Sequence, residues 1–268
     1  MKLGILAGYG KLPQIVAQKA AALNYELCIA ALDQNNLENF HPYNCQSFSI
    51  GQVGKIIDFF KTNQVRQLVL AGKVDRPNWQ YLKPDALGAI LLAKIMKNKL
   101  FGDDTLMQTI DVFLKEQGFE VVSFLDILSY GNQVEYVTKA KPYEQDLLDV
   151  ELALEVAQVI GRFDIGQSVV IERGCVIGVE GQEGTDALLV RCAQLIKFQK
   201  PSGVLVKLAK PCQSLRLDPP AFGSNTIQAI HDCGLRGIAY EHNKIALIDI
   251  HDTFALADKL GIFIYPIC

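Results

Sequence analysis

The first half of the chain alternates short apolar runs with segments of helical periodicity. Residues 3–7 and 26–32 are apolar runs of strand length, and residues 11–23 between them carry apolar side chains at helical spacing. The alternation continues with a helix near 52–62, a strand near 67–71, helices between 84 and 117, and a strand at 119–124. This βαβ pattern predicts a parallel sheet and hence a Rossmann-like domain.

The second half of the chain has a different rhythm. After a polar stretch at 132–142, residues 143–160 have the pattern of one long amphipathic helix, and the remainder mixes short strands with helices. The whole pattern predicts an α/β fold of two domains with a ligand cleft between them. We expect a Rossmann-like N-terminal domain at 1–135, a linker with the long helix at 136–165, and a mixed α/β C-terminal catalytic domain at 166–268.

The composition narrows the classes of function. Half of the 268 residues are hydrophobic, and 26 Lys+Arg stand against 29 Asp+Glu, so the chain can bury a core but lacks the basic field of a nucleic-acid-binding protein. No signal-peptide pattern and no run of roughly 20 apolar residues is present, which predicts a soluble cytoplasmic protein. The seven cysteines have no metal-binding spacing and are expected to be reduced thiols.

A glycine-containing turn follows the first predicted strand. Gly8 and Gly10 occupy two positions of a dinucleotide-binding fingerprint, but Pro13 stands where the third glycine would be. The turn suits a phosphate or sugar that approaches the backbone, and it equally suits a plain tight connection. Asp33, at the end of the second strand, is where an NAD-dependent enzyme carries its ribose-binding carboxylate. An NAD-dependent oxidoreductase therefore stays open as an alternative.

A basic pair follows the predicted strand at 67–71. Lys73 and Arg76 come directly after this strand, and ligands of open α/β sheets bind beyond the carboxyl ends of the strands. The two cations therefore suit an anionic ligand.

Residues 84–101 form an apolar segment with lysines toward its end. Such a segment can contact acyl chains or an anionic membrane face, and the alternative is an ordinary packing helix.

Three carboxylates lie within seven residues in the second half of the chain. Glu180, Glu183 and Asp186 precede the apolar run at 187–190, where Thr185 or Asp186 is a natural helix N-cap. Carboxylates near a phosphate site also suit Mg²⁺, which takes oxygen ligands. The capping and metal-binding interpretations both stay open.

Asp218 stands between Arg216 and a Pro–Pro pair, so a rigid backbone holds it just before a predicted helix. Such a carboxylate can ligate a metal or orient an attacking water as general base. Lys207, Lys210 and Arg216 supply cations that can neutralise phosphate charge in a transition state. The alternative is a cluster of surface salt bridges near a turn.

Two other classes of hydrolase lack their markers. The four histidines show no HExxH or HxH spacing, and no GxSxG motif occurs. The sequence therefore supports neither a zinc hydrolase nor a serine esterase.

Six motifs occur in an order that carries a resemblance to a known family. They are Gly4-Ile-Leu-Ala-Gly-Tyr-Gly-Lys-Leu-Pro13, Ala71-Gly-Lys-Val-Asp-Arg-Pro77, Gly102-Asp-Asp104, Gly166-Gln167, Glu183-Gly-Thr-Asp186 and Lys210-Pro-Cys-Gln-Ser-Leu-Arg-Leu-Asp-Pro219. Together they resemble the LpxI family of UDP-2,3-diacylglucosamine pyrophosphatases of lipid A synthesis. The resemblance covers nearly the whole chain, and the last two motifs are the most specific.

The resemblance implies a two-domain enzyme that uses Mg²⁺ to hydrolyse the UDP-lipid pyrophosphate to UMP and 2,3-diacylglucosamine 1-phosphate (lipid X). It places the family's essential aspartate at Asp218 and its EGTD residues at 183–186. The chain departs from the family pattern at Gly181-Gln182, in place of Ala-Ile, and at Pro220-Ala-Phe222, in place of Pro-Thr-Ile. These departures flank the charged residues and concern substrate fit more than the chemistry.

The motifs and the resemblance together define an expected site. The catalytic residue is Asp218, and the expected Mg²⁺ ligands are Asp218, Glu183 and Asp186. The expected substrate-binding residues are Gly8, Gly10, Pro13, Lys73, Arg76, Thr185, Asp186, Lys207, Lys210, Gln213 and Arg216.

The expected partner is a nucleotide-activated lipid and not a nucleic acid. We also expect peripheral contact with the inner membrane, and a homodimer is left open. A non-catalytic nucleotide-sugar or lipid-binding module is the alternative from another class.

Overall fold

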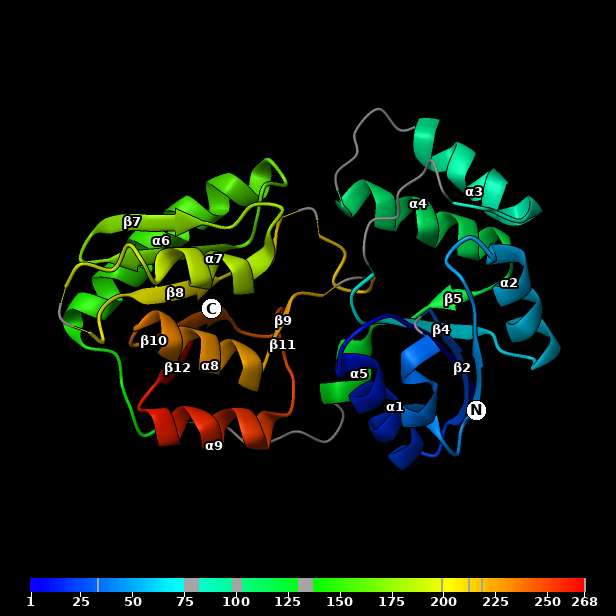
Figure 1. Ribbon diagram of the computed structural model, residues 1–268, viewed down its shortest axis with the longest axis horizontal. Helices are drawn as coiled ribbons and strands as arrows, with labels where there is room; N and C mark the ends of the chain where they lie inside the picture. The colour runs from blue at the N-terminus through cyan, green and yellow to red at the C-terminus, as the bar shows by residue number, and fades with distance from the viewer. Residues whose placement is uncertain are drawn as a thin grey trace. The chain divides into compact units, whose positions relative to one another are not determined.

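The chain folds into two compact units (Figure 1). The computed structural model describes residues 1–32, 34–74, 82–97, 103–129, 137–198, 200–211, 213–217 and 219–267. The first unit comprises Met1–Asn132 and Ser214–Asp218, and the second comprises Gln133–Gln213 and Pro219–Cys268. The motif and site residues named above that lie outside the described part are Asp33, Asp75, Arg76, Pro77, Gly102, Cys212 and Asp218.

The first unit contains a sheet of five parallel strands in the order β3-β2-β1-β4-β5. The strands are β1 (Lys2–Ala7), β2 (Glu26–Ala31), β3 (Asn44–Ser47), β4 (Gln67–Ala71) and β5 (Glu120–Val121). The chain moves outward from β1 to β3 and then returns to the other side of β1 with β4. Ligands of open α/β sheets bind at such a reversal, beyond the carboxyl ends of the strands.

Helices fill both sides of this sheet and enclose a core. The helices are α1 (Leu12–Ala22), the 3-10 helix η1 (Gln34–Phe40), α2 (Val53–Thr62), α3 (Ala86–Lys97), α4 (Asp103–Glu116) and α5 (Phe124–Ser129). Helix α1 packs against α5, whereas α3 packs against both α2 and α4. One core cluster joins Phe60 of α2, Leu68 of β4 and Leu114 of α4, and Leu217 from the distant segment 214–218 is a member of it.

Two strands of the first sheet differ from the sequence prediction. The sequence predicts no strand at 44–47, because Asn-Cys-Gln-Ser is polar. It forms the edge strand β3, whose side chains are only half-buried at best and need no apolar run. The strand predicted at 119–124 is limited to β5, because helix α5 already begins at Phe124.

The second unit contains a mixed sheet in the order β12-β10-β8-β6-β7. The strands are β6 (Ser168–Glu172), β7 (Cys175–Val179), β8 (Val204–Lys207), β10 (Gly237–Glu241) and β12 (Phe263–Ile267), and a separate parallel pair joins β9 (Ala221–Phe222) to β11 (Ala246–Leu247). Strands β8, β10 and β12 are parallel, and β6 runs antiparallel to β7 and β8. The start of β6 and the ends of β7, β8 and β10 therefore share one edge of the sheet.

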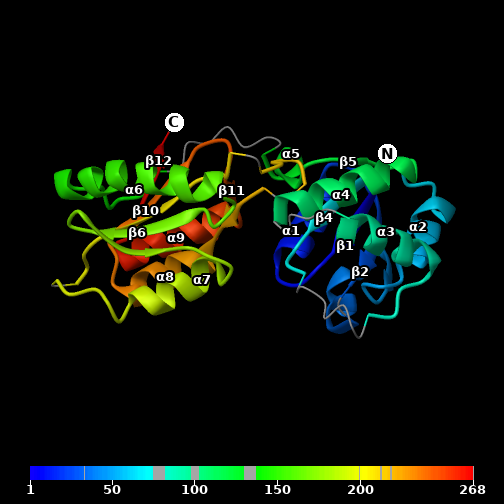
Figure 2. The same cartoon turned by 90° about the horizontal axis from the view of Figure 1, so that it is seen from above.

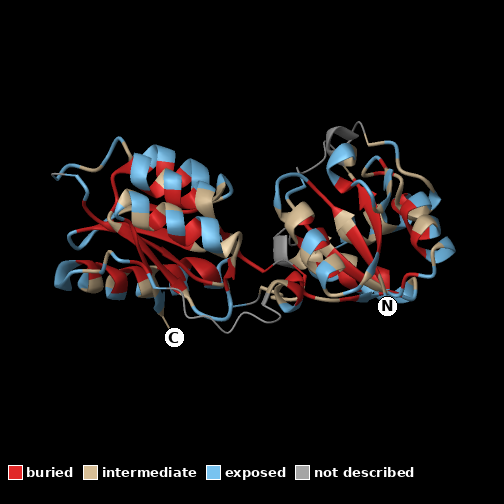
Figure 3. Cartoon of the chain, turned by 90° about the horizontal axis from the view of Figure 1, so that it is seen from below, coloured by how far each residue is buried: buried red, intermediate tan, exposed pale blue. Residues whose placement is uncertain are grey.

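Both faces of the mixed sheet are covered by helices. The helices are α6 (Glu144–Arg162), α7 (Gly184–Cys192), α8 (Ser224–Cys233) and α9 (Ile250–Leu260). Figure 2 shows α6 on one face and the other three helices on the opposite face, with a separate core cluster on each side. All five residues of β6 are buried for this reason. In Figure 3 the inner strands of both sheets are mostly buried, whereas the edge strands β3 and β7 are partly exposed, and the helices expose one side.

The two units differ from the expected domain division in two places. The long helix α6, expected in a linker at 136–165, packs on β6 and β8 and is part of the second unit. Residues 214–218, expected in the C-terminal domain, belong to the first unit. The structure confirms an α/β fold with one parallel and one mixed sheet, and the expected ligand cleft stays a prediction.

Candidate active site

Lys207 is the last residue of β8, and only 4% of its surface is exposed. A buried ammonium group is unfavourable unless polar groups surround it. The Nζ atom of Lys207 donates a hydrogen bond to Oγ1 of Thr185 at 2.8 Å. Thr185 and Lys207, which were both expected to bind substrate, are thus brought together at one edge of the second sheet.

Thr185 joins Lys207 to two further buried polar residues. Its Oγ1 atom lies 3.3 Å from each carboxylate oxygen of Glu180 and 3.1 Å from Oγ of Ser168. Ser168 is the first residue of β6 and pairs with Lys207 in the register, and Glu180 directly follows β7. We call Ser168, Glu180, Thr185 and Lys207 the Thr185 cluster. In it, one hydroxyl group bridges a buried ammonium and a buried carboxylate.

Helix α7 begins at Gly184 and not at the residue predicted from the sequence. Glu183 occupies the N-cap position and makes no side-chain capping bond, so the expected N-cap role of Thr185 or Asp186 is wrong. Both residues lie inside the first helical turn. The hydroxyl group of Thr185 therefore does not cap the helix, and it makes the hydrogen bonds of the Thr185 cluster instead.

The Gly166-Gln167 motif lies beside this cluster. A Cβ atom on Gly166 would lie 2.1 Å from the backbone oxygen of Glu180, so only glycine fits there. The backbone oxygen of Gln167 accepts a hydrogen bond from Leu208 at 2.9 Å, next to the end of β8. Within the described part of the chain, Oε1 of Gln167 is a buried acceptor without a hydrogen-bond partner, which is rare in folded proteins.

The loop after β8 is held by its own polar side chains. Lys210 forms an ion pair with Asp164 and is largely covered. The Gln213 Oε1 atom accepts from the Lys210 backbone at 3.2 Å, and the Gln213 backbone donates to the Lys210 oxygen at 3.0 Å. Glu241, at the end of β10, accepts from the Ala209 backbone at 3.0 Å. These contacts keep the loop near the carboxyl ends of β8 and β10, and substrate binding by Lys210 and Gln213 stays a prediction.

Glu183 and Asp186, two of the three expected metal ligands, are exposed. The Oε1 atom of Glu183 accepts a hydrogen bond from Arg191 at 2.7 Å, and Oε2 accepts one from the Gly181 backbone at 3.1 Å. Arg191 is the main reason that the pKa of Glu183 is lowered. Among the described residues, no three carboxylate, thiol or imidazole side chains gather closely enough to hold a metal ion. Magnesium binding by Glu183 and Asp186 therefore stays a prediction.

Arg216 lies on the first unit and not with Lys207 and Lys210 on the second. Its Nη1 atom donates to the backbone oxygen of Val121 at 3.0 Å, and its Nη2 atom forms an ion pair with Asp111 of helix α4. The three cations expected to act together are thus divided between the two units.

The turns after β1 and β4 close on each other at the reversal of strand order. The Tyr9 backbone donates to the Lys73 oxygen at 2.7 Å, and the Lys73 backbone donates to the Tyr9 oxygen at 3.0 Å. A Cβ atom on Gly8 would lie 2.3 Å from that Lys73 oxygen. Gly8 is therefore explained by contact with the chain itself. Lys73 is exposed at this edge.

Gly10 and Pro13 have different reasons for their residue types. Gly10 has a φ of +92°, which favours glycine, and a Cβ atom there would meet nothing within 4 Å. Pro13 lies in the first turn of α1, as the sequence predicts, and its Cγ atom would lie 2.7 Å from a Cβ atom on Gly72. Of the two glycines in this turn that were expected to bind substrate, only Gly10 therefore borders open space.

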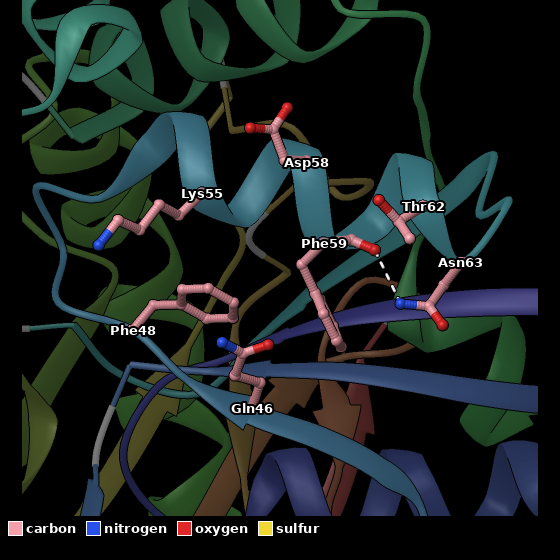
Figure 4. A pocket seen from close by; sticks show the side chains of 7 residues that line it. All are labelled: Gln46, Phe48, Lys55, Asp58, Phe59, Thr62 and Asn63. Atoms are coloured by element: carbon pink, nitrogen blue, oxygen red, sulfur yellow. Dashed lines mark hydrogen bonds between the residues drawn. The ribbon is translucent and has the colours of Figure 1, made fainter.

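A surface hollow of about 360 Å³ lies between β3 and α2 (Figure 4). It contains the neighbouring rings of Phe48 and Phe59, whose centroids are 5.6 Å apart, and the Asn63 side chain donates to the Phe59 oxygen at 2.8 Å. Strand β3 is the edge strand, so the hollow is removed from the reversal between β1 and β4. None of the described residues expected to bind substrate lines it.

Five cysteines in the described part of the chain are free thiols, namely Cys28, Cys45, Cys175, Cys192 and Cys233. Burial raises the pKa of Cys45 to about 11 and that of Cys233 to about 11. These two thiols stay protonated at neutral pH and are poor nucleophiles.

Three acidic residues in these arrangements were missed by the sequence analysis. Asp111 is 105 residues from its partner Arg216, Asp164 is 46 residues from its partner Lys210, and Glu241 is 32 residues from its partner Ala209. None of them belongs to a motif with a local spacing rule. No signal along the chain could therefore have identified their partners.

The comparisons with known proteins agree over the two halves of the chain. The family model described as the LpxI N-terminal domain matches residues 2–130, and the one described as the LpxI C-terminal domain matches residues 133–265. A relative from Caulobacter vibrioides, described as "UDP-2,3-diacylglucosamine pyrophosphatase LpxI", is 33% identical over 269 residues, which are 98% of this chain and 96% of the relative.

A solved structure of N5-carboxyaminoimidazole ribonucleotide synthetase from Thermotoga maritima matches with a TM-score of 0.27 and 11% identity, over 68% of this chain and 41% of that chain. A TM-score this low does not indicate a shared fold or function. The two domain matches and the full-length relative are sufficient, and they show that this chain belongs to the LpxI family.

Proposed function

We propose that this protein hydrolyses the pyrophosphate of UDP-2,3-diacylglucosamine to UMP and 2,3-diacylglucosamine 1-phosphate in lipid A synthesis. The observation that carries the proposal is the relative with this activity in its name, which is 33% identical over 98% of the chain. The Thr185 cluster supports the proposal, because it offers a buried positive charge at the sheet edge where α/β proteins bind ligands.

Lys207 stabilises the negative charge that develops on phosphate oxygens in the transition state. An ammonium group in a buried position interacts with such charge more strongly than an exposed one, and it needs no reorganisation during the reaction. Thr185 fixes the ammonium group through the 2.8 Å hydrogen bond. Glu180 is a positioning residue, because it touches Thr185 and keeps the hydroxyl group oriented.

Asp218 orients the attacking water in this proposal and receives its proton, as the resemblance implies. The water oxygen bonds to the β-phosphorus, and the bond between this phosphorus and the bridging oxygen breaks. The bridging oxygen leaves with UMP, and the water oxygen stays on the lipid phosphate.

A magnesium requirement is part of the proposal. Bound Mg²⁺ would neutralise charge on the pyrophosphate oxygens, and such ions are commonly held by one or two carboxylates together with substrate phosphates. This donor set fits Asp218 better than Glu183, whose carboxylate is paired with Arg191. Ligation by Glu183 and Asp186 stays a prediction, and a magnesium titration of Glu183→Gln and Asp186→Asn tests it.

The test of the activity is hydrolysis of UDP-2,3-diacylglucosamine in ¹⁸O-labelled water, with Mg²⁺ or with EDTA, by the native protein and Asp218→Ala. We expect magnesium-dependent release of UMP, with the label in the lipid phosphate, and loss of turnover in the variant. Label in UMP would instead show attack on the α-phosphorus. Binding of the substrate without turnover by the native protein would contradict the proposal and favour a binding module.

We infer that the first unit is Rossmann-like. Its five parallel strands in the order β3-β2-β1-β4-β5 support this assignment, since the same order forms the first part of the dinucleotide-binding fold. The assignment concerns the fold and does not by itself imply NAD binding.

We also propose that the exposed side of α3 contacts the membrane interface or the acyl chains. This side consists of Ala86, Ala89, Ile90, Ala93, Met96 and Lys97, and Ile90 and Met96 are 50% and 65% exposed. An apolar stripe with a terminal lysine suits an interfacial helix. In the described part of the chain, no helix is both long and apolar enough to cross a membrane.

Sedimentation with anionic vesicles tests the contact. Binding that weakens in an Ile90→Ser/Met96→Ser variant would support it, and equal binding by the variant would contradict it. A cytoplasmic location and a homodimer are also proposed, and light scattering of the purified protein tests the dimer.

A further inference from the structure

We propose that Asp111 is a positioning residue for the reaction, because its ion pair with Arg216 holds the segment that leads to Asp218 on the first unit. The inference rests on the proposed function, in which Asp218 acts on the water. It also changes the role expected for Arg216, from a phosphate clamp to an anchor.

The segment 214–217 is fastened to the first unit at several points. Ser123 donates from Oγ to the Leu215 oxygen at 2.8 Å, and Arg216 donates to the Val121 oxygen at 3.0 Å. The Leu217 side chain is buried in the same core cluster as Phe60 and Leu68. The chain on either side of 214–218 belongs to the second unit, so these contacts are long-range and are not a consequence of chain proximity.

The ion pair of Arg216 with Asp111 differs from an ordinary surface pair. The Asp111 side chain is only 9% exposed, and its Oδ2 atom accepts from Arg216 while Oδ1 is buried without a hydrogen-bond partner among the described residues. A nearly buried carboxylate needs a cation beside it, because an unpaired charge out of water is unfavourable. Lys115, one helical turn along α4, is the second cation at 2.9 Å.

The contacts of Arg216 favour a role as an anchor of segment 214–217 over a role as a phosphate clamp. The guanidinium group is oriented by two fixed acceptors on the first unit, the Asp111 carboxylate and the Val121 oxygen. Its charge is also partly cancelled by Asp111. Asp218 is the second residue after Arg216, so the anchor fixes the described segment that directly precedes Asp218 in the sequence.

The experiment compares Asp111→Asn, Arg216→Met, Arg216→Lys and the double variant Asp111→Asn/Arg216→Met. We expect kcat to fall roughly ten- to hundredfold in Asp111→Asn and Arg216→Met, because a small misplacement of a reacting group has effects of this size. We expect KM to change less than about twofold, the double variant to resemble the single ones, and Arg216→Lys to recover part of kcat.

Hydrogen exchange of the peptide that contains 213–217 is measured on the same variants. Faster exchange of this peptide in Asp111→Asn, with unchanged exchange in the strands β1 and β4, is the expected result. This measurement does not depend on activity, so it separates failure of the anchor from failure of the proposed function.

Lys115→Met is the matched control, since it removes the other cation of Asp111 and leaves Arg216 in place. We expect it to keep kcat within about twofold of native, because this lysine is on the exposed side of the pair. Two results would overturn the inference. One is unchanged exchange of 213–217 in Asp111→Asn, and the other is a rise in KM with unchanged kcat in Arg216→Met together with native kinetics in Asp111→Asn.

Discussion

The ammonium group of Lys207 and the hydroxyl group of Thr185 lie 2.8 Å apart although 22 residues separate them in the sequence. The register of the mixed sheet causes this approach. It places Lys207 at the end of β8 opposite Ser168 at the start of β6, and helix α7 then brings Thr185 over the same edge. The Thr185 cluster is therefore a product of strand pairing, and its function can be tested one group at a time.

Replacing the buried lysine is expected to reduce turnover. Lys207→Met keeps most of the side-chain volume but removes the charge, and loss of one transition-state donor typically lowers kcat about 100-fold or more. Steady-state hydrolysis of UDP-2,3-diacylglucosamine measures the change. Lys139→Met is the control, because that lysine is largely exposed and its distance to Asp258 is 3.8 Å. Equal losses in the two variants would show that Lys207 has no special role.

Changing the bridging hydroxyl is expected to reduce stability. Thr185→Val is nearly isosteric, but it leaves the Glu180 carboxylate and the Lys207 ammonium without the hydroxyl between them. Loss of a buried partner of this kind costs about 1–3 kcal/mol of the free energy of unfolding. Thr185→Ser retains the hydroxyl and is expected to stay close to native. Urea unfolding measures both variants, and a native midpoint for Thr185→Val would contradict the role of the bridge.

Asp85 is expected to stabilise two helices at once. Its Oδ2 atom accepts from the Gly54 backbone at 2.8 Å in the first turn of α2, and its Oδ1 atom accepts from the Gly88 backbone at 2.8 Å in the first turn of α3. Asp85→Ala should therefore lower the free energy of unfolding by about 1–2 kcal/mol, the usual size for loss of a cap. Urea unfolding of the variant and of native protein at pH 7 measures this difference.

The contribution of Asp85 is also expected to depend on pH. Burial raises the pKa of Asp85, but the backbone N–H groups of Gly88, Gly54 and Lys55 outweigh it, so the pKa lies below the ordinary value of 3.8. A lowered pKa means stabilisation that is complete well above 3.8 and is lost as the pH falls through the folded-state pKa. The difference between native and Asp85→Ala should therefore shrink in acid. A constant difference down to about pH 2 would be inconsistent with this assignment.

The two glycines after β1 are expected to respond differently to alanine. Gly8→Ala would place a Cβ atom 2.3 Å from the Lys73 oxygen, so the turns after β1 and β4 must separate. Gly10→Ala meets no neighbour within 4 Å, but its φ of +92° is strained for alanine by about 1 kcal/mol. Thermal unfolding should therefore show a larger loss for Gly8→Ala. The reverse order would argue that the contact with Lys73 is not maintained in solution.

Several features of this protein were determined by the sequence alone. Apolar runs and helical periodicity are local, so they placed β1, α1, β2, α2 and β4 close to their observed bounds. The sequence did not predict the polar edge strand β3, because the side chains of an exposed edge strand need no apolar pattern. The motifs carried the family, since each is a contiguous run of residues, and the comparisons show the same family.

Only the tertiary structure decided which of the motif residues act together. In the folded protein Thr185 accepts a hydrogen bond from Lys207. Glu183 pairs with Arg191, and Arg216 pairs with Asp111 on the first unit. The physical reason is that a charged side chain lowers its free energy by pairing with whichever polar or oppositely charged group the fold brings near. That partner is set by strand register and by helix packing, which no spacing along the chain encodes.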